Sequence, residues 1–320
     1  MYIFSAKKIF ITGGLGFIGS NLICYLKKNK YNGEIIIFDN NSIDNVTALN
    51  KLKEFNHLKI IYGDLRLTQL LDESIKSCDL VIHLAANSDI SKGIFNPKID
   101  FENTVLGTQN LLNSMLKNNV KNIIFSSGSG VYGDVVKKNI PEDYGPLIPV
   151  SHYGASKLCA ESMISSYVFM HDFNALVFRF ANVIGTGQTH GVAYDFIRKV
   201  KKNNLTLQVL GNGTQLKSYI DINDIIKAID ISSKKFSKNI DFYNVCTDDS
   251  ITVREIAIMV IKKMKVNLKI NFGKSNFGWR GDVPKISLSN EKIKSIGWIY
   301  SMNTRQAMEH SISEMLKEIS

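Results

Sequence analysis

Near the start of the chain, three glycines separate a short apolar segment from a helical one. Residues 7–12 have the pattern of a β-strand, Gly13, Gly16 and Gly19 follow at three-residue spacing, and residues 20–30 have a helical pattern. A strand, a glycine-rich turn and a helix N-terminus form a phosphate cradle, because glycines let the backbone approach the anion and the helix end offers unpaired N–H groups. This order predicts the first unit of a dinucleotide-binding sheet.

The rest of the chain alternates between strand-like and helical segments. Further apolar runs lie at 34–39, 58–63, 79–85, 121–127, 175–181 and 240–246, and the helical stretches between them include 102–119 and 152–172. This alternation predicts an α/β fold, a Rossmann-type doubly wound parallel sheet with helices on both faces.

From about residue 183 the pattern loosens into a loop, a helix over 192–203 and shorter elements. We therefore expect two domains. Residues 1–182, with about 219–246, would form the NAD-binding Rossmann domain. Residues 183–218 and 247–320 would form a smaller, discontinuous α/β cap that binds the substrate.

An acidic residue ends the second strand-like run, as Asp39 follows Gly19 by 20 residues. A carboxylate there accepts hydrogen bonds from the adenosine ribose hydroxyls and repels a 2′-phosphate. Asp39 therefore predicts NAD rather than NADP as the cofactor. The structural alternative is a solvated aspartate at the end of a strand.

Tyr153 and Lys157 stand four residues apart in a helical stretch, so they share one face of that helix. An unperturbed tyrosine has a pKa of about 10 and is protonated at neutral pH. A nearby cation lowers this pKa and makes the phenol a usable base on a sugar or alcohol hydroxyl. The pair alone occurs often by chance, and it gains meaning from the glycine-rich segment and Asp39 upstream.

Composition excludes several classes of protein. The 320 residues are 44% hydrophobic, enough for a substantial core, and contain no apolar run long enough for a membrane span. The chain enters the first strand directly, so we expect no secretory leader. The four cysteines lack metal-ligand spacing, which indicates reduced thiols in a cytoplasmic protein and no metal site. The net charge of +10 comes from dispersed lysines, so we expect no nucleic-acid or membrane partner and a surface that attracts a small anionic substrate.

The chain resembles the extended short-chain dehydrogenase/reductase superfamily, specifically its NAD-dependent sugar-nucleotide epimerases and dehydratases. The UDP-glucose 4-epimerase branch is the most similar. The resemblance covers nearly the whole chain and rests on motifs in one order, at 12–20, 63–66, 83–86, 126–133, 153–157, 179–185, 217–224 and 280–284.

This resemblance implies a set of cofactor-binding residues. It places Gly13, Gly16, Phe17, Ile18 and Gly19 around the pyrophosphate, Asp39 and Asn40 at the adenosine ribose, Asp64 and Leu65 beside the adenine, and Leu84, Ala85, Ala86, Asn103 and Ser126 along the cofactor groove. It also implies that Lys157 holds the nicotinamide ribose and lowers the pKa of Tyr153, the catalytic base.

On the substrate side, the resemblance implies that Asn182, Val192, Lys217 and Arg280 hold the nucleotide diphosphate. The guanidinium of Arg280 offers bidentate geometry that an ammonium lacks. Related enzymes usually have arginine in place of Lys217, which predicts a weaker clamp here. The alternatives are a surface ion pair between Arg280 and Asp282, and a loop-capping role for Asn182.

One position departs from the family pattern. Relatives carry Ser or Thr three residues before Val131, where the hydroxyl relays the proton of the sugar to the tyrosine; this chain has Gly128. Ser127 and Ser129 flank it and are further catalytic candidates, with water as another relay. Alternatively, both serines only satisfy loop backbone. Loss of the relay would lower the rate on the order of 10² without abolishing activity.

The same segment separates the possible reactions. The 4,6-dehydratases carry Asp-Glu after their Thr, and uronic-acid decarboxylases carry a Glu at the second of these positions; this chain has Ser129 and Gly130. We therefore expect NAD-dependent epimerisation at C4 of a nucleotide-diphosphate sugar of the UDP-hexose type, through a transient 4-keto intermediate. The alternatives are a 4,6-dehydratase or keto-sugar reductase on the same scaffold, and a non-catalytic NAD-binding member. The resemblance also implies a homodimer formed through 102–119 and 152–172; alternatively, these helices are apolar enough to belong to the core.

Overall fold

A computed structural model describes residues 1–319 except 43–45, 53–54, 88 and 204. Within this part of the chain, seven parallel strands form a central sheet in the order β11-β6-β5-β4-β1-β2-β3. The strands are β1 (Lys8–Thr12), β2 (Glu34–Asp39), β3 (Leu58–Tyr62), β4 (Leu80–His83), β5 (Asn122–Gly128), β6 (Asn174–Phe180) and β11 (Ile240–Val245). The predicted doubly wound parallel sheet is confirmed.

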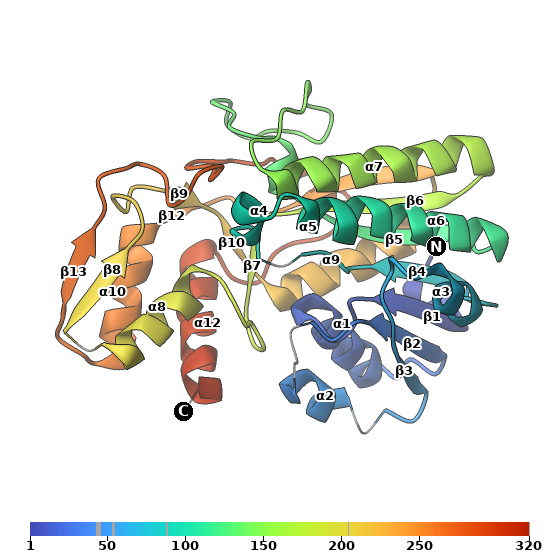
Figure 1. Cartoon of the computed structure of the whole chain (residues 1–320), viewed down its shortest axis with the longest axis horizontal. Helices are drawn as coiled ribbons and strands as arrows, with labels where there is room; N and C mark the ends of the chain where they lie inside the picture. The colour runs from blue at the N-terminus through green and yellow to red at the C-terminus, as the bar shows by residue number, and fades with distance from the viewer. Residues whose placement is uncertain (43–45, 53–54, 88, 204, 320) are drawn as a thin grey trace.

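Helices cover both faces of this sheet (Figure 1). One face carries α1 (Phe17–Lys28), α2 (Val46–Leu52) and α9 (Ile222–Lys235), and the other carries α3 (Thr68–Ser74), α6 (Gly107–Lys117) and α7 (His152–His171). The short helices α4 (Lys92–Phe95) and α5 (Lys98–Asp100) and a π-helical turn (Phe101–Leu106) precede α6. The helical stretch predicted at 102–119 therefore begins with a wide turn, a feature common at functional sites.

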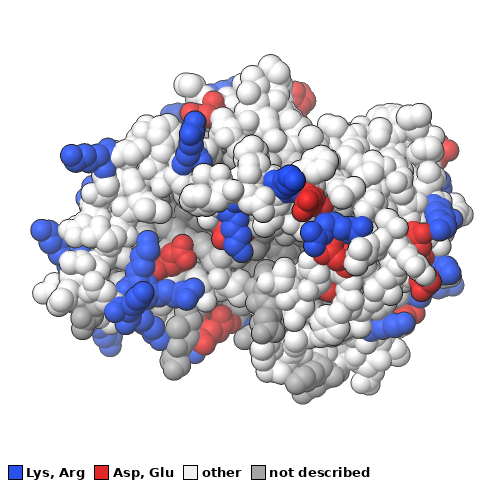
Figure 2. All heavy atoms as spheres, viewed as in Figure 1, with Lys and Arg blue, Asp and Glu red and all other residues white. Residues whose placement is uncertain are grey.

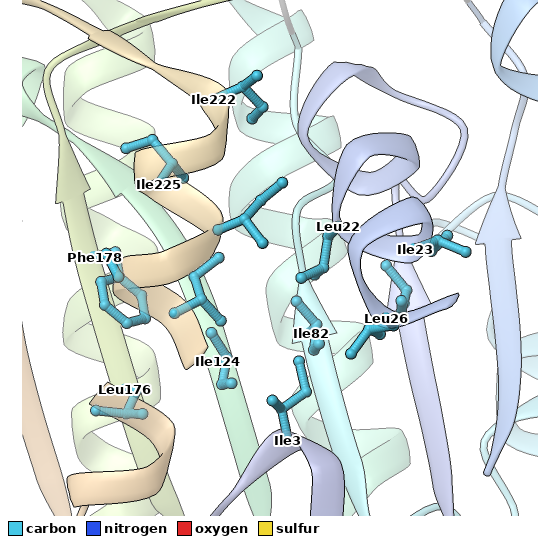
Figure 3. Close-up of a cluster of buried hydrophobic side chains, with 14 of the residues drawn as sticks. Ile3, Leu22, Ile23, Leu26, Ile82, Ile124, Leu176, Phe178, Ile222 and Ile225 are labelled. Carbon is cyan, nitrogen blue, oxygen red and sulfur yellow. The ribbon is translucent and has the colours of Figure 1, made fainter. Parts of the chain in front are cut away.

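The strands are apolar throughout because the sheet is buried on both faces. In β1, Ile9 and Ile11 pack into one core with α1 and α9, while Phe10 points into the other core with α6 and α7. Figure 3 shows the first core, in which Leu22 of α1 and Ile225 of α9 lie above the side chains of the sheet. Alternation along each strand thus supplies both cores from one run of residues.

The remaining segments form the smaller part of the molecule, drawn at the left of Figure 1. Its strands pair as β7 (Asn182–Ile184) with β10 (Tyr219–Asp221), β9 (Leu216–Lys217) with β12 (Ile251–Thr252), and β8 (Thr206–Val209) with β13 (Lys269–Phe272). Its helices are α8 (Val192–Lys202), α10 (Val253–Met264) and α12 (Thr304–Ile319), which share a third hydrophobic core. We call this part the cap.

The chain returns from the cap to the central sheet later than the sequence suggests. Residues 219–221 pair with β7 rather than with the central sheet, and only α9 and β11 rejoin the large sheet. Helix α11 (Glu291–Ser295) then packs beside β11. The division into two domains stays a prediction, with its second boundary nearer residue 222. No described helix combines the length and apolar character that crossing a membrane requires.

Candidate active site

A cavity of about 890 Å³ lies between the carboxyl ends of the central strands and the cap. Figure 2 shows the surface hollowed between the two parts of the molecule. The strand order reverses between β1 and β4, and ligands of open α/β sheets bind at such a point. The predicted residues that line the cavity are Gly13, Gly16, Phe17, Ile18, Gly19, Asp39, Asn40, Asp64, Leu65, Leu84, Ala85, Ala86, Asn103, Ser126, Ser127, Ser129, Tyr153, Lys157, Asn182, Val192 and Lys217. Arg280 is the predicted site residue that does not line it.

The glycine-rich segment joins β1 to α1 in a tight turn at the switch point. Gly13 has φ +69°, and a Cβ added there would lie 2.8 Å from the Ala85 nitrogen. A Cβ at Gly19 would lie 2.6 Å from the Gly13 oxygen. Helix α1 begins directly after this turn with Gly16 as its N-cap, which supplies no side-chain acceptor. Its first N–H groups are therefore suited to an anion, and the segment fits a pyrophosphate.

Asp39 ends β2 beside this turn and binds two backbone N–H groups. Its carboxylate accepts hydrogen bonds from the Leu15 nitrogen at 3.0 Å and the Asn41 nitrogen at 2.8 Å. Burial raises the pKa of Asp39, while these hydrogen bonds lower it. Asp39 therefore braces the glycine-rich turn, which is more than a solvated strand end would do, and its role at the ribose stays a prediction.

Asp64 lies on the same rim, where the guanidinium of Arg66 donates two hydrogen bonds to it and the Arg66 backbone N–H donates a third, which lowers the pKa of Asp64 to about 2. Asn40 donates to the same carboxylate at 3.3 Å. On the other side of the cavity, Asn103 lies in the π-helical turn, and its side-chain amide donates to the Ile99 oxygen at 2.8 Å. These contacts hold Asp64 and Asn103 in place along the predicted cofactor groove.

Tyr153 and Lys157 lie in the first turns of α7 and face the cavity together. Ser151 caps this helix, because its hydroxyl accepts a hydrogen bond from the Gly154 nitrogen at 3.0 Å. The Lys157 ammonium donates to the Ser126 oxygen at 2.7 Å and lies 5.8 Å from the centre of the Tyr153 ring. The shared helix face that the spacing predicts is confirmed.

The sequence predicts a lowered pKa for Tyr153, but the surrounding protein residues raise this pKa instead. Burial raises the pKa of Tyr153 to about 12, and the carboxylate of Asp100 acts in the same direction. Burial also lowers the pKa of Lys157 to about 7, against the influence of Glu161 and Asp100. Because the ammonium is itself desolvated, it is a weak source of positive charge for the phenol at neutral pH.

The two serines that flank Gly128 lie in different surroundings. Phe125 and Ser127 share one face of β5, and the Phe125 ring lies 4.8 Å from the Lys157 ammonium. The Ser127 hydroxyl is buried on this side and has no hydrogen-bond partner within the described residues. Ser129, in the 3₁₀ turn Ser129–Val131, lines the cavity and is half-buried.

Gly128 itself is not required by backbone or packing. Its φ of −161° is ordinary extended backbone, and an added Cβ would meet only the Phe180 oxygen at 3.8 Å. Gly154 of α7 is different, since a Cβ there would lie 2.5 Å from the Gly130 oxygen. The close approach of α7 to the turn at Gly130 therefore depends on a glycine, while the position of the missing hydroxyl has room for a side chain.

Three of the four predicted diphosphate ligands, Asn182, Val192 and Lys217, line the cavity, and Arg280 does not. The Lys217 ammonium forms an ion pair with the buried Asp282 at 2.5 Å and lies 5.0 Å from the Trp279 ring. Arg280 is exposed and lies outside the cavity. Asp282 forms its ion pair with Lys217 and not, as considered above, with Arg280. The side-chain amide of Asn182, the first residue of β7, donates to the Ser218 oxygen at 3.1 Å, and its role at the diphosphate stays a prediction.

Sequence reasoning missed the polar wall that the cap contributes. Gln188, Thr189 and His190 of the 185–191 loop line the cavity, as do Asp195 and Lys199 on one face of α8. The loop carries no periodic pattern, and only its position before α8 signalled it.

The segments 183–218 and 247–320 also hold 17 lysines and arginines against 9 aspartates and glutamates, so most of the net charge of +10 belongs to the cap. Figure 2 shows basic side chains gathered over the region of α8, beside the hollow.

Comparison with known proteins places this site in a family. The model of the NAD dependent epimerase/dehydratase family matches residues 9–246. The chain belongs to this family. Its cofactor is therefore NAD, as Asp39 predicts, and the protein is an enzyme of the epimerase/dehydratase type.

Members of the epimerase/dehydratase family with different reactions are similar to this chain. A putative UDP-glucose 4-epimerase of Methanocaldococcus jannaschii is 30% identical over 314 residues, which cover 96% of this chain and 98% of that protein. The crystal structure of a UDP-galactose 4-epimerase superposes with a TM-score of 0.87 at 30% identity, covering 98% of this chain and 100% of that one. The dTDP-D-glucose 4,6-dehydratase of Dictyostelium discoideum is 31% identical over 272 residues, 80% of this chain and 62% of that protein.

Proposed function

We propose that the protein is a nucleotide-sugar 4-epimerase acting on a diphosphate-linked hexose of the UDP type. The carrying observation is that Tyr153 and Lys157 face the cavity beside a turn, Ser129–Val131, that holds no carboxylate. Elimination of water needs an acid and a base, which the related dehydratases carry at the positions of Ser129 and Gly130, whereas inversion at C4 needs one proton acceptor and a hydride acceptor. The similarity to two UDP-sugar 4-epimerases supports the same choice.

In this mechanism Tyr153 takes the proton of the sugar 4-hydroxyl. It returns the proton after the 4-keto sugar has rotated and presents its other face. Bound NAD supplies the hydride acceptor and donor, and its positive nicotinamide ring lowers the pKa of a nearby phenol. Lys157, tied to the Ser126 carbonyl oxygen, orients the ribose end of the cofactor groove. No cofactor is consumed, because the hydride removed from C4 returns to C4.

The cap suits an anionic substrate. It carries most of the positive charge of the chain, and a positively charged surface raises the rate at which a diphosphate arrives. We propose that Lys217 and Val192 contact the diphosphate and that Lys217 exchanges its bond to Asp282 for one to the substrate. Asn182 would then support the β7–β10 pair beside it rather than bind directly.

The test is direct conversion without added reductant. Purified protein is shown to hold NAD and is then incubated with UDP-galactose, UDP-N-acetylgalactosamine and their C4 epimers, with NMR following the C4 configuration. Inversion supports the proposal. If a protein that holds NAD inverts none of these sugars, the proposal fails.

The competing reactions have their own signatures in the same samples. A 4,6-dehydratase would give a 4-keto product that absorbs in alkali. This reaction is tested because the 4,6-dehydratase of Dictyostelium discoideum is similar to this chain. A keto-sugar reductase would consume NADH or NADPH in proportion to product. A non-catalytic NAD-binding member would show none of these, and Gly128 is the observation that favours testing it.

We also propose a homodimer through α6 and α7. Phe101, Leu106, Phe169 and Met170 are exposed apolar residues at or beside these helices, and large exposed apolar side chains often mark an interface. Light scattering of the wild type and of Phe169→Asp tests the proposal; a wild-type monomer would contradict it. A cytoplasmic location stays a prediction from the four free cysteines.

A further inference from the structure

The loop at 185–191 connects β7 to α8 and reaches from the cap to the dinucleotide-binding part. Gln188, Thr189 and His190 line the cavity on one side of this loop. On the other side, the amide of Asn21 in α1 donates to the Thr186 oxygen at 3.0 Å and to the Phe17 oxygen at 2.9 Å. The loop is therefore attached within one helical turn of the phosphate cradle.

Glu318, near the end of α12, holds the same loop from the cap. The Gly187 nitrogen donates to both carboxylate oxygens, at 3.0 and 3.2 Å. The Lys51 ammonium of α2 lies 3.8 Å from one of these oxygens. An N–H group bound to a carboxylate forms a charge-assisted hydrogen bond, which is about twice as strong as a neutral one.

Gly187 lies at the point where these elements meet. Its φ is +85°, and an added Cβ would lie 3.7 Å from the Asn21 amide nitrogen and 3.8 Å from the Lys51 ammonium. Helices α1 and α2 of one part and α12 of the other therefore converge on this single residue. The Lys51 pair is partly exposed and contributes little alone. The hydrogen bonds from the Gly187 nitrogen to Glu318 attach this residue to α12, and Ser311 of the same helix donates to the Gln188 side-chain oxygen at 3.4 Å.

We propose that Glu318 is a positioning residue that fastens the 185–191 loop across the cofactor end of the cavity and slows the release of NAD. The loop and the glycine-rich segment line one cavity, so loosening the loop opens a wall of the cofactor site. Slow release suits an enzyme that regenerates its cofactor in each turnover. The inference rests on the NAD site and not on which sugar reaction the protein performs.

The test compares two variants of α12. Glu318→Ala removes the carboxylate that binds Gly187, and Glu309→Gln removes a charge of the same sign from an exposed position earlier on the helix. Each protein, loaded with NAD and without sugar, is mixed with alcohol dehydrogenase and ethanol, which convert released NAD to NADH. We expect release to be about tenfold faster in Glu318→Ala and unchanged in Glu309→Gln.

A second variant keeps the inference falsifiable if Glu318→Ala does not fold. Asn21→Ala detaches the loop from α1 and should also speed release, while Lys51→Gln should change it by less than about twofold. Thermal unfolding of each variant shows that the protein is folded. Release at the wild-type rate from folded Glu318→Ala, or from Asn21→Ala in its place, would overturn the inference. A purified wild type that holds no NAD would overturn it too.

Discussion

The Lys157 ammonium lies 5.8 Å from the centre of the Tyr153 ring, and both groups are desolvated at the wall of one cavity. Desolvation raises the pKa of Tyr153 to about 12 and lowers the pKa of Lys157 to about 7. The surrounding protein therefore favours the neutral form of both side chains. Positive charge from the cofactor is what we expect to activate the pair.

Tyr153→Phe removes the proposed proton acceptor and leaves the ring in place. We expect turnover to fall by about 10³ or more, while the content of bound NAD stays at the wild-type level. NMR of the sugar and absorbance of extracted NAD provide the two measurements. Retained turnover would show that another group takes the proton.

Lys157 should make stability depend on pH. Its pKa falls from 10.5 to about 7 on folding, so between these values the unfolded state binds the additional proton. Stability then rises with pH across this window, by up to about 1.4 kcal/mol per pH unit. Chemical unfolding of wild type and Lys157→Met from pH 7 to about 10 isolates this contribution by difference. Parallel curves for the two proteins would contradict the pKa of Lys157.

Gly128→Ser restores a hydroxyl at a position with room for it. The backbone there is extended and the nearest atom to a new Cβ is 3.8 Å away, so we expect a folded protein of similar stability. Turnover should rise by up to about 10² if no other group relays the proton. Ser127→Ala and Ser129→Ala are measured in the same assay. If Gly128→Ser leaves the turnover rate unchanged and one of the two alanine variants lowers it, the serine replaced in that variant is the relay.

Arg280→Ala tests whether the guanidinium binds substrate. Because Arg280 is exposed outside the cavity, we expect the KM for the nucleotide sugar to change by less than about threefold. Initial rates over a range of sugar concentrations give this value. An increase of tenfold or more would mean that the segment closes onto the diphosphate when substrate binds.

Gly154→Ala should destabilise the protein and displace α7. Its new Cβ would lie 2.5 Å from the Gly130 oxygen, whereas the matched change Gly145→Ala meets no atom within 4 Å. We expect Gly154→Ala to lower the free energy of unfolding by about 1–3 kcal/mol and Gly145→Ala to change it little. Denaturant unfolding of the two variants provides the comparison, and equal stabilities would contradict the close packing of α7.

The sequence predicts best where local rules operate. Apolar runs between helical segments located the strands of the central sheet. Three glycines after the first strand located the tight turn that contains Gly13 and Gly19. The spacing of Tyr153 and Lys157 predicted a shared helix face because a helix repeats every 3.6 residues. Each of these features depends on residues close together in the chain.

Tertiary structure alone decided the rest, because the partners are distant in sequence. Lys217 pairs with Asp282 and leaves Arg280 outside the cavity, which no local pattern encodes. The pKa of Tyr153 follows from burial and from Asp100 on another element. Glu318 meets Gly187 across 131 residues. The sequence by itself determined the sheet, the cofactor and the shared helix face of Tyr153 and Lys157, while long-range packing determined the charges and contacts around them.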